Sequence, residues 1–484
     1  MRAHAHYAHA TQREIEMRIS LCARRGYIRT QMNKFYKINT YGCQMNVHES
    51  EKIAGILEKM GYVDCPENEN PDVIVFNTCC IRDTAERRAL GNIGVTKAEK
   101  KRNPNLILAV VGCMPQQDGV KENIKERFPY VDIVLGTRNI SALENEIEKV
   151  IEGREKIKKR SDKKYRCFDV EQPVDYLDID ENTPQTRTSF PNAWVNIIYG
   201  CNNFCTYCIV PYARGREVSR DMQNVLDEVK KCVDEGYKEI TLLGQNVNSY
   251  GNDVEDESVN FANLLREIDK IEGDFRIRFM TSHPKDLNDD IIDAMASSKH
   301  VCHNLHLPIQ AGSDKVLANM NRRYDSVHYL EIIRKLRERM PDIGITTDIM
   351  VGFPTETEED FQDTLEIVRK VRYSNAFTFI YSPRKGTPAA KMEQIPYAVK
   401  QERIARLIKL QNSITKEISK TYIGNVYRVL CEDVAPKLDG MVCGREDGGR
   451  LVTFEGSKDD IGKFFDVKIT ESKSASLFGH KEEV

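Results

Sequence analysis

The sequence lacks the features of a membrane or secreted protein. Its 484 residues contain no apolar run that approaches the roughly 20 residues needed to span a bilayer. The first thirty residues are polar, carry scattered arginines and do not form a secretory signal. The 14 cysteines are too dilute in a chain of this length for a disulfide scaffold. We therefore expect a cytoplasmic protein without a membrane partner, in which clustered thiols serve as ligands.

The chain also lacks an excess of charge of one sign. Its 71 lysines and arginines nearly balance 74 aspartates and glutamates, which gives a formal net charge of -3. A nucleic-acid partner would have to be met by local basic patches. The length exceeds the size at which a single hydrophobic core keeps growing, so two to four domains are expected.

The N-terminal segment has little sign of structure. Residues 1–33 contain three spaced histidines, His4, His6 and His9, which could bind a metal. A disordered extension is the interpretation we favour, and Met32 could be the true start of translation.

Three cysteines stand together as Cys201, Cys205 and Cys208, directly after an apolar strand-like stretch at residues 193–199. Three thiols in eight residues can hold three irons of a cubane and leave the fourth iron open to a substrate or cofactor. Half of a zinc site and unrelated thiols are the alternatives. Zinc sites usually pair two CxxC units or add histidines, and the neighbouring sequence has neither.

From residue 34 to residue 152, short apolar strands alternate with amphipathic helices. Strands are expected at residues 35–39, 72–76, 106–111 and 131–135, and helices at 47–60 and 141–151. This alternation favours an open, mostly parallel α/β sheet.

Three more cysteines follow strands of this first unit. Cys43, Cys79 and Cys113 each come just after a predicted strand. Ligands of open α/β sheets bind at the carboxyl ends of strands, so these distant thiols should converge on a second cluster. Buried structural cysteine is the alternative for any one of them. Cys80 is adjacent to Cys79, and position alone does not choose between the two.

Several motifs surround these cysteines. They are Tyr41-Gly42-Cys43-Gln44-Met45-Asn46, Asn77-Thr78-Cys79 and Gly112-Cys113-Met114, followed by Gly200-Cys201 to Cys208, Ile209-Val210-Pro211-Tyr212 and Arg214-Gly215-Arg216-Glu217. Together they resemble the methylthiotransferase family of radical S-adenosylmethionine (SAM) enzymes. The resemblance runs from about residue 34 to the C-terminus and implies Cys79, rather than Cys80, as the ligand. It leaves the role of Cys80 open.

Strand–helix alternation resumes in the second unit, residues 191–420, after a linker at 153–190. About six βα units fit the partial TIM-like (β/α)6 barrel that the family uses, with its chemistry at the carboxyl ends of the strands. The strands are expected at residues 239–243, 277–280, 304–307, 344–349 and 376–381, and the helices at 221–235, 328–340 and 358–371.

The resemblance also implies SAM contacts at the strand ends. Gly244 and Gln245 match the positions that meet the amino group of SAM, and Tyr207 the position beside its adenine. Gln310 and Ser313 are weaker candidates, and each of these residues could be an ordinary turn residue. His283 and His306 could act as acid or base, or be structural.

Basic residues recur in three other places. Arg214 and Arg216 could hold the carboxylate of SAM, touch RNA phosphate or pair with Glu217. The linker has a basic run at 154–166 and an acidic stretch at 175–181, which could be solvated or could meet phosphates. Lys400, Arg403, Arg406 and Lys409 recur on a helix that we expect to close the barrel and to present a basic stripe.

The last unit, residues 421–484, changes to a period of two. Strands at 426–430, 451–454 and 465–469 are separated by glycines, which predicts a small antiparallel β-barrel. Its order resembles the TRAM domain, an RNA-binding module. RNA contact would need Arg428, Arg445 and Arg450 on one side, with a stacking ring from Tyr427 or Phe454.

The resemblance implies a reaction that cofactors carry, because sulfur insertion at an unactivated aromatic carbon exceeds side-chain acid–base chemistry. Two 4Fe-4S clusters are expected, one to cleave SAM to a 5′-deoxyadenosyl radical and one to hold the sulfur. No catalytic side chain is assigned. The motifs look closest to the branch that methylthiolates N6-isopentenyladenosine beside the anticodon of tRNA. Implied partners are tRNA, an electron donor such as flavodoxin or ferredoxin and a sulfur donor, and a monomer is expected.

Two alternatives remain open at this point. The chain could act on threonylcarbamoyladenosine in tRNA, or it could be a non-catalytic iron–sulfur sensor that binds RNA. The second alternative predicts clusters without SAM cleavage.

Overall fold

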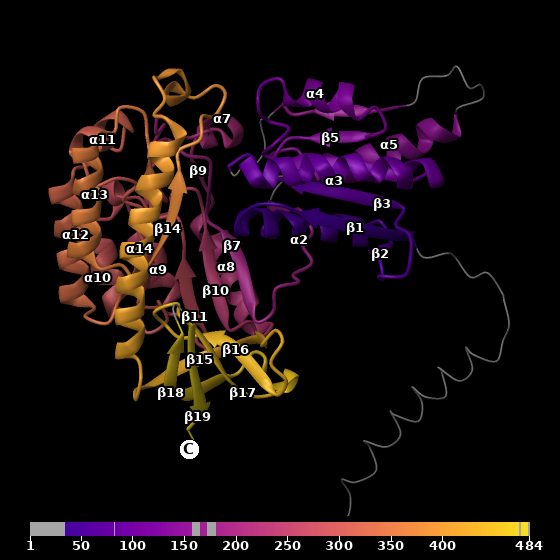
Figure 1. Cartoon of the computed structure of the whole chain (residues 1–484). Coiled ribbons are helices and arrows are strands. Elements are labelled where there is room, and N and C mark those ends of the chain that lie inside the picture. Colours follow the sequence, from indigo (N-terminus) through magenta and orange to yellow (C-terminus); the bar gives the residue numbers. More distant parts are fainter. Residues whose placement is uncertain (1–33, 82, 157–164, 172–180, 474–475, 483–484) are drawn as a thin grey trace, which may run out of the picture.

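The protein is described by a computed structural model that covers residues 34–81, 83–156, 165–171, 181–473 and 476–482 (Figure 1). The expectations for residues 1–33, for most of the basic run and for most of the acidic stretch lie outside these residues. Within them, no helix is both long and apolar enough to cross a bilayer. The chain forms an N-terminal α/β sheet, a partial barrel and a small closed β-barrel, as the predicted fold class requires.

The N-terminal sheet is parallel and has the strand order β2-β1-β3-β4-β5-β6. Its central strands consist of buried residues, as expected for a sheet covered on both faces. The strands are β1 (Lys34–Thr40), β2 (Tyr62–Asp64), β3 (Val73–Thr78), β4 (Ile107–Gly112), β5 (Ile133–Leu135) and β6 (Cys167–Asp169).

Helices cover both faces of this sheet. One face packs against α2 (Gln44–Lys59) and α5 (Leu143–Glu155) through residues such as Ile53 and Ile147. The other packs against α3 (Asp83–Arg102) and α4 (Val120–Arg127) through residues such as Ile93 and Ile124. All four strands predicted from the alternation are present.

The expected linker at 153–190 is partly structured. Its residues Cys167–Asp169 form β6, which extends the sheet beside β5. Farther along, Gln185 donates to Glu51 of α2, and the Thr188 amide donates to the same carboxylate. These contacts attach the chain that leads into the barrel to the N-terminal sheet.

The second unit is a partial barrel of six parallel strands. Two three-stranded sheets, β11-β10-β7 and β12-β13-β14, are joined by a parallel bridge between Ile277 and Val301. The strands are β7 (Asn192–Asn196), β10 (Glu239–Leu243), β11 (Arg276–Phe279), β12 (Asn304–His306), β13 (Gly344–Val351) and β14 (Asn375–Ile380). The stretch expected as one strand at 193–199 is divided, because β8 (Ile198–Tyr199) leaves β7 and pairs antiparallel with β9 (Val218–Ser219).

Helices surround the barrel on its outside (Figure 1). Three of them match predicted helices closely, and α13 has the predicted bounds. The helices are α7 (Val210–Arg214), α8 (Met222–Asp234), α9 (Phe261–Ile268), α10 (Asp289–Ser297), α11 (Asp314–Asn319), α12 (Ser326–Arg339), α13 (Glu358–Val371) and α14 (Tyr397–Thr421).

The basic stripe predicted on α14 is wrong. Lys400 and Arg403 are buried against the barrel, and Arg403 donates to the carboxylate of Glu356 at 2.6 Å. Arg406 pairs with Glu358 and Glu402. Arg403 and Arg406 follow the helical period because they meet carboxylates on α13 and its preceding loop. Lys400 donates to the Tyr381 carbonyl, and Lys409 is exposed.

The C-terminal unit is a closed barrel with the strand order β15-β16-β17-β19-β18. The strands are β15 (Val426–Val434), β16 (Met441–Arg445), β17 (Leu451–Glu455), β18 (Phe464–Lys473) and β19 (Ser476–Lys481). Phe454 lies in the barrel core and cannot be the expected stacking ring, and Arg450 is buried against Tyr422. Arg428 and Arg445 remain exposed, each beside a carboxylate.

Candidate iron–sulfur site between the first two domains

The Cys201–Cys208 loop leaves β8 at the top of the barrel and enters α7. The backbone amide of Cys201 donates to Gly215 at 3.1 Å, and the Cys208 amide donates to Cys205 at 2.9 Å. Cys201 and Cys205 are buried and Cys208 is half-buried. The structure therefore brings the three predicted thiols together in one folded loop.

Two residues that the sequence did not single out hold this loop. Asn321 donates to the carbonyls of Asn203 and Phe204 at 3.2 and 3.1 Å. Arg322 is buried and donates from Nη1 to the Cys205 sulfur at 3.3 Å and from Nη2 to the Pro308 carbonyl at 3.0 Å. They follow α11, more than one hundred residues from the loop, so no local spacing could have revealed them.

The loop thiols lie in a buried environment and interact with one another. Burial, together with the neighbouring Cys205 and Cys201, raises the pKa of Cys208 to about 12. Burial likewise raises the pKa of Cys201 to about 11. Thiols whose pKa is raised in this way need positive charge to be held as thiolates, which a metal centre supplies and Arg322 assists.

The N-terminal cysteines also converge. Gly42, with φ +131°, precedes Cys43, and a Cβ atom at this glycine would lie 2.6 Å from the Cβ atom of Cys79. The Cys113 amide donates to the Thr78 carbonyl at 2.9 Å. The loops after β1, β3 and β4 therefore meet at the carboxyl edge of the sheet.

Hydrogen bonds from two buried asparagine side chains connect these loops to each other. Asn46 donates to the side chain of Asn77 and to the Thr78 carbonyl, both at 3.1 Å. Asn77 in turn donates to the Asn46 carbonyl at 2.7 Å. These residues belong to the motifs around the cysteines, but the sequence analysis assigned no role to them. The signal that could have suggested one is an asparagine close to Cys43 and another close to Cys79.

Cys80 is part of the same cluster of thiols. Its thiol hydrogen-bonds with that of Cys113, and this contact and burial raise the pKa of Cys80 well above its ordinary value. The same hydrogen bond, followed by the charge of Arg214, lowers the pKa of Cys113 against the effect of burial. The Cys79 sulfur accepts from the Ile81 amide at 3.3 Å. Cys79 and Cys80 therefore both lie at the N-terminal cysteine site, where they contact different partners.

Among the described residues, no three or more histidine, cysteine, aspartate or glutamate side chains are placed as around a single metal ion. A cubane cluster makes a different demand, because each thiolate binds its own iron and the ligands lie on separate corners. The absence of such a group among the described residues therefore applies to sites for a single metal ion and does not test a cubane cluster.

The helix that follows the barrel cysteine loop packs against the N-terminal cysteine site. Ile209 and Ala213, at the start of and within α7, pack against Cys80 and Cys113. Met45, two residues after Cys43, has its sulfur 2.7 Å from Arg214 Nη1 and 2.9 Å from Gln245 Nε2. A single side chain of the N-terminal sheet thus touches both α7 and a predicted SAM contact.

Four of the predicted SAM contacts follow the carboxyl ends of barrel strands, and Tyr207 lies in the cysteine loop after β8. Tyr207 packs edge-on against Phe353 at 6.5 Å between ring centroids, and burial raises its pKa well above the usual range. The Gly244 carbonyl accepts from the Thr281 hydroxyl at 2.8 Å. Gln245 contacts Met45, as described above. These three residues lie near the cysteine loops.

Gln310 and Ser313 have roles within the fold. Gln310 has a left-handed backbone, with φ 72°, and its amide and carbonyl pair with β13. Ser313 caps α11 and donates to Asp360 at 2.7 Å. The hydroxyl of Ser313 is therefore already used to join α11 to α13.

The histidines considered as acid or base, and the two arginines that follow the barrel cysteine loop, also have defined partners within the fold. His283 Nδ1 accepts from the Lys285 amide, and burial lowers the pKa of His283 far enough to keep it neutral at pH 7. His306 meets the Thr346 hydroxyl at 2.9 Å. Arg214 pairs with Glu49 at 2.8 Å, not with Glu217. Arg216 is exposed, over the Phe204 ring.

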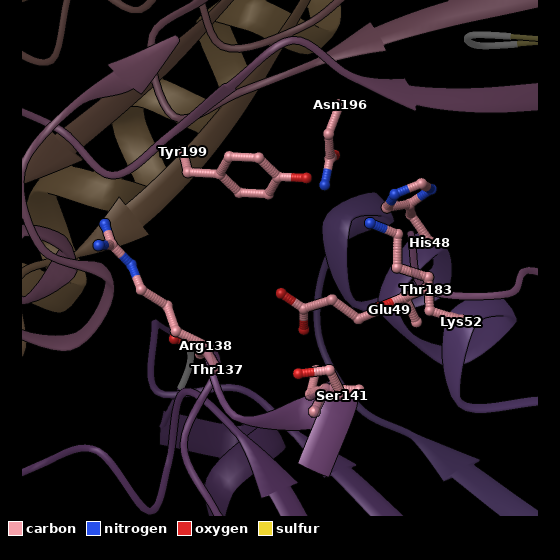
Figure 2. Close-up of a pocket in the computed structure, with 10 residues that line it drawn as sticks. His48, Glu49, Lys52, Thr137, Arg138, Ser141, Thr183, Asn196 and Tyr199 are labelled. Carbon is pink, nitrogen blue, oxygen red and sulfur yellow. The ribbon is translucent and has the colours of Figure 1, made fainter. Parts of the chain in front are cut away.

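A small polar cavity lies at the interface between the N-terminal domain and the barrel unit. Figure 2 shows Glu49 of α2 on one side of it, and Asn196 and Tyr199 of the barrel unit on the other. The space of ≈ 10 Å³ is about enough for one water molecule. The interface is therefore tightly packed, with polar groups from both units.

Three protein families match successive parts of the chain. The Uncharacterized protein family UPF0004 matches residues 35–136, the Radical SAM superfamily matches 195–368 and the TRAM domain matches 420–481. These ranges follow the N-terminal sheet, the partial barrel and the closed barrel in order.

Curated relatives are similar over nearly their whole length. The tRNA-2-methylthio-N(6)-dimethylallyladenosine synthase of Clostridium botulinum strain Langeland is 49% identical, over 92% of this chain and 96% of the relative. The synthase of the same name from Carboxydothermus hydrogenoformans is 50% identical, over 92% and 99%.

Solved structures share the fold at low identity. The radical S-adenosylmethionine methyltransferase TsrM from Kitasatospora setae has a TM-score of 0.54 and 14% identity, over 74% of this chain and 75% of that one. The cobalamin-dependent S-adenosylmethionine radical enzyme OxsB has a TM-score of 0.51 and 12% identity, over 79% and 58%.

Proposed function

The chain belongs to the family of the tRNA-2-methylthio-N(6)-dimethylallyladenosine synthases, radical SAM tRNA methylthiotransferases, and on this premise we propose that it methylthiolates N6-isopentenyladenosine beside the anticodon of tRNA. The product is 2-methylthio-N6-isopentenyladenosine. The isopentenyl group is the dimethylallyl group in the names of the relatives.

One observation carries this proposal: helix α7, which directly follows the barrel cysteine loop, packs on the N-terminal cysteine site of the other domain. Ile209 and Ala213, which follow Cys208, pack on Cys113 and its neighbour Cys80. A reaction that both inserts sulfur and uses a radical needs two cofactor sites within reach of one substrate atom. Two cysteine sites linked by the packing of α7 meet this need, whereas two separated electron-transfer clusters would not require it.

The barrel loop suits a 4Fe-4S cluster with an open iron. Cys201, Cys205 and Cys208 would hold it, and Arg322 would donate to the Cys205 sulfur. When bound, the cluster and SAM supply one-electron chemistry that side chains cannot provide. Tyr207, Gly244 and Gln245 would position SAM beside it, and Gln310 and Ser313 would support the strand ends from which it is held.

The N-terminal loops suit a second cluster. Cys43, Cys79 and Cys113 would hold it, and the N-terminus of α2, which begins directly after Cys43, favours a negative group there. Cys80 would remain a neighbour of the cluster through its contact with Cys113. This second site would hold the sulfur that is transferred.

The C-terminal barrel would bind the tRNA substrate. Its exposed Arg428 and Arg445 offer positive charge, and the Tyr422 and Tyr427 rings stack on each other at 4.8 Å. We expect the protein to act as a monomer that receives electrons from flavodoxin or ferredoxin and sulfur from a separate donor.

The decisive experiment is an anaerobic assay. The protein is reconstituted with iron and sulfide and given dithionite, SAM and tRNA that carries isopentenyladenosine; the RNA is then digested for mass spectrometry. We expect a methylthio mass gain on that nucleoside together with 5′-deoxyadenosine. A Cys205→Ala variant should give neither.

The substrate is tested in parallel. tRNA that carries threonylcarbamoyladenosine should remain unmodified. A mass gain only on that nucleoside would move the assignment to the other branch. Two intact clusters without 5′-deoxyadenosine would contradict an enzymatic role and favour a sensor.

A further inference from the structure

Arg214 stands out because it belongs to one domain and its side chain enters the site of the other. It ends α7, the short helix that follows the barrel cysteines, and its side chain is only 5% exposed. Its Nη1 donates to Glu49 at 2.8 Å and approaches the Met45 sulfur at 2.7 Å. Both partners belong to α2, the helix that begins after Cys43.

Two donor groups of this guanidinium are left over. In the part of the chain that the structure describes, neither Nε nor Nη2 of Arg214 has a well-formed hydrogen bond. A buried N–H group without a partner costs free energy of the order of 1–3 kcal/mol, and more when the group is charged. Such a group is retained where it has a partner in the working protein.

The surroundings indicate what that partner is. Glu49 supplies one negative charge, and the thiols of Cys113 and Cys43 also interact electrostatically with the Arg214 guanidinium. Ile209 and Ala213 on the same helix lie on Cys113 and Cys80, so α7 covers the N-terminal cysteine site. The partner that fits two free guanidinium donors here is an anionic sulfur group.

Helix α7 is also fixed from the opposite side. Arg138, which follows β5 of the N-terminal sheet, donates from Nη2 to the Arg214 carbonyl at 2.7 Å and to the Arg216 carbonyl at 3.2 Å. The two arginines thus point across the interface in opposite directions. This arrangement leaves the Arg214 guanidinium little freedom to turn away from the cysteines.

We propose that Arg214 completes the N-terminal cysteine site: its Nε and Nη2 donate to the sulfur atoms of the cluster on Cys43, Cys79 and Cys113. The proposal rests on the proposed function, which places a cluster on these residues. Arg214 is a positioning residue: it holds the N-terminal cluster against the barrel loop and offsets its negative charge. The site is then incomplete without the second domain.

The test isolates the N-terminal cluster in the full-length chain. The parent protein carries Cys201→Ala, Cys205→Ala and Cys208→Ala, so that any cluster is the N-terminal one. Arg214→Met, Arg214→Lys, Glu49→Gln and Arg216→Met are each added to it. The measurements are iron and sulfide per chain, the rate of iron loss to a chelator and the midpoint potential followed by electron paramagnetic resonance.

Arg214→Met should move the midpoint potential to a more negative value, because the loss of a donor and a positive charge disfavours the reduced cluster. Iron loss should become roughly ten-fold faster, the scale found when an outer-shell partner of a metal ligand is removed. Arg214→Lys keeps the charge but not the planar fork, so its effect should be smaller. Arg216→Met, the matched control on an exposed arginine, should match the parent.

Glu49→Gln separates this role from a merely structural one. It breaks the same ion pair but removes a negative charge instead of a positive one. The midpoint potential of its cluster should therefore not become more negative, as that of Arg214→Met should. Equal shifts in both variants, or an Arg214→Met cluster that behaves like the parent, would overturn the proposal while the proposed function stands. A parent without any cluster would overturn both.

Discussion

At the scale of single residues, the backbone at Gly200 decides where Cys201 lies. Gly200 has φ +72°, and a Cβ atom there would come within 2.0 Å of the Arg216 carbonyl oxygen. The loop after β8 and the segment after α7 can approach this closely only without a side chain. The position of Cys201, the first proposed ligand of the barrel cluster, therefore depends on the residue before it.

Gly200→Ala should lower the free energy of unfolding by about 3 kcal/mol, because left-handed strain and a backbone collision add together. Iron bound by the barrel site should fall as well. Urea unfolding and iron analysis measure these effects. Gly236→Ala is the matched control: it has φ +92° with nothing within 4 Å, so it should cost only about 1 kcal/mol. Equal losses would show that the contact with Arg216 is unimportant.

At the scale of elements, α14 is held to the barrel by a buried ion pair. Arg403 contacts both the carboxylate and the carbonyl of Glu356, at 2.6 and 3.1 Å. Three residues along the helix, Arg406 makes its ion pairs at the surface, with 36% of its side chain exposed. The same residue type thus occurs in two environments on one helix.

Arg403→Met should lower the free energy of unfolding by about 3 kcal/mol, because it leaves a buried carboxylate without its partner. Arg406→Met should change it by less than about 1 kcal/mol, the usual value of an exposed pair. Urea unfolding of both variants at pH 7 gives the comparison. A larger effect for Arg406 would contradict the assignment of the buried pair as the main anchor.

At the scale of the whole molecule, the partial barrel and the closed barrel share a buried charge network. Glu239 of β10 accepts from Arg276 and Arg278 of β11, each at 2.7 Å. Arg278 continues to the carbonyls of Glu446 and Asp447 in the closed barrel, at 2.6 and 2.8 Å. Burial alone would raise the pKa of Glu239, but the two arginines lower it overall.

Glu239→Gln should lower the free energy of unfolding by about 3 kcal/mol at pH 7, since two buried cations lose their carboxylate. A depressed carboxyl pKa stabilises the fold above the unfolded value of about 4.3, and this contribution is lost as the pH falls through the folded value. The difference from the wild type should therefore shrink in acid. Urea unfolding at pH 7 and in acid measures it, with Glu272→Gln, at a carboxylate 93% exposed, as the control. A difference independent of pH would contradict this account.

The contact between the N-terminal sheet and the chain entering the barrel should make stability pH-dependent. His48 of α2 is buried, contacts Gln185 at 3.1 Å and has its pKa lowered well below the ordinary value by burial and then by the nearby cations. The folded state keeps His48 neutral, whereas the unfolded chain takes up a proton below about pH 6.5. Acid therefore favours unfolding.

The wild type should lose about 1.4 kcal/mol per pH unit through His48 below pH 6.5, in addition to the effects of other groups. His48→Gln should remove this part of the slope. Unfolding free energies between pH 7.5 and 5 test it, with the exposed His328→Gln as the matched variant. Parallel slopes in wild type and His48→Gln would contradict the prediction.

Several elements could be predicted from the sequence because their apolar residues recur at a regular spacing. The buried strands β3 and β4 and the helix α13 have enough residues for the apolar pattern to repeat. The three-residue strands β2 and β6 do not, and β16 and β19 were missed as well. The basic period on α14 was visible, but its interpretation as a surface stripe was wrong. A charge pattern is the same whether the partner is water or a carboxylate on another element.

The sequence by itself determined the α/β fold class and the motifs that carry the six proposed cysteine ligands, because strand ends and short spacings are local properties of the chain. Only the tertiary structure decided that Arg322 meets Cys205 and that Arg214 crosses to Glu49, 117 and 165 residues apart. Contacts over such separations form when domains pack, and they depend on shape and buried charge rather than on spacing. For this reason the proposed ligands were visible in the sequence, whereas the role of Arg322 and the partner of Arg214 were not.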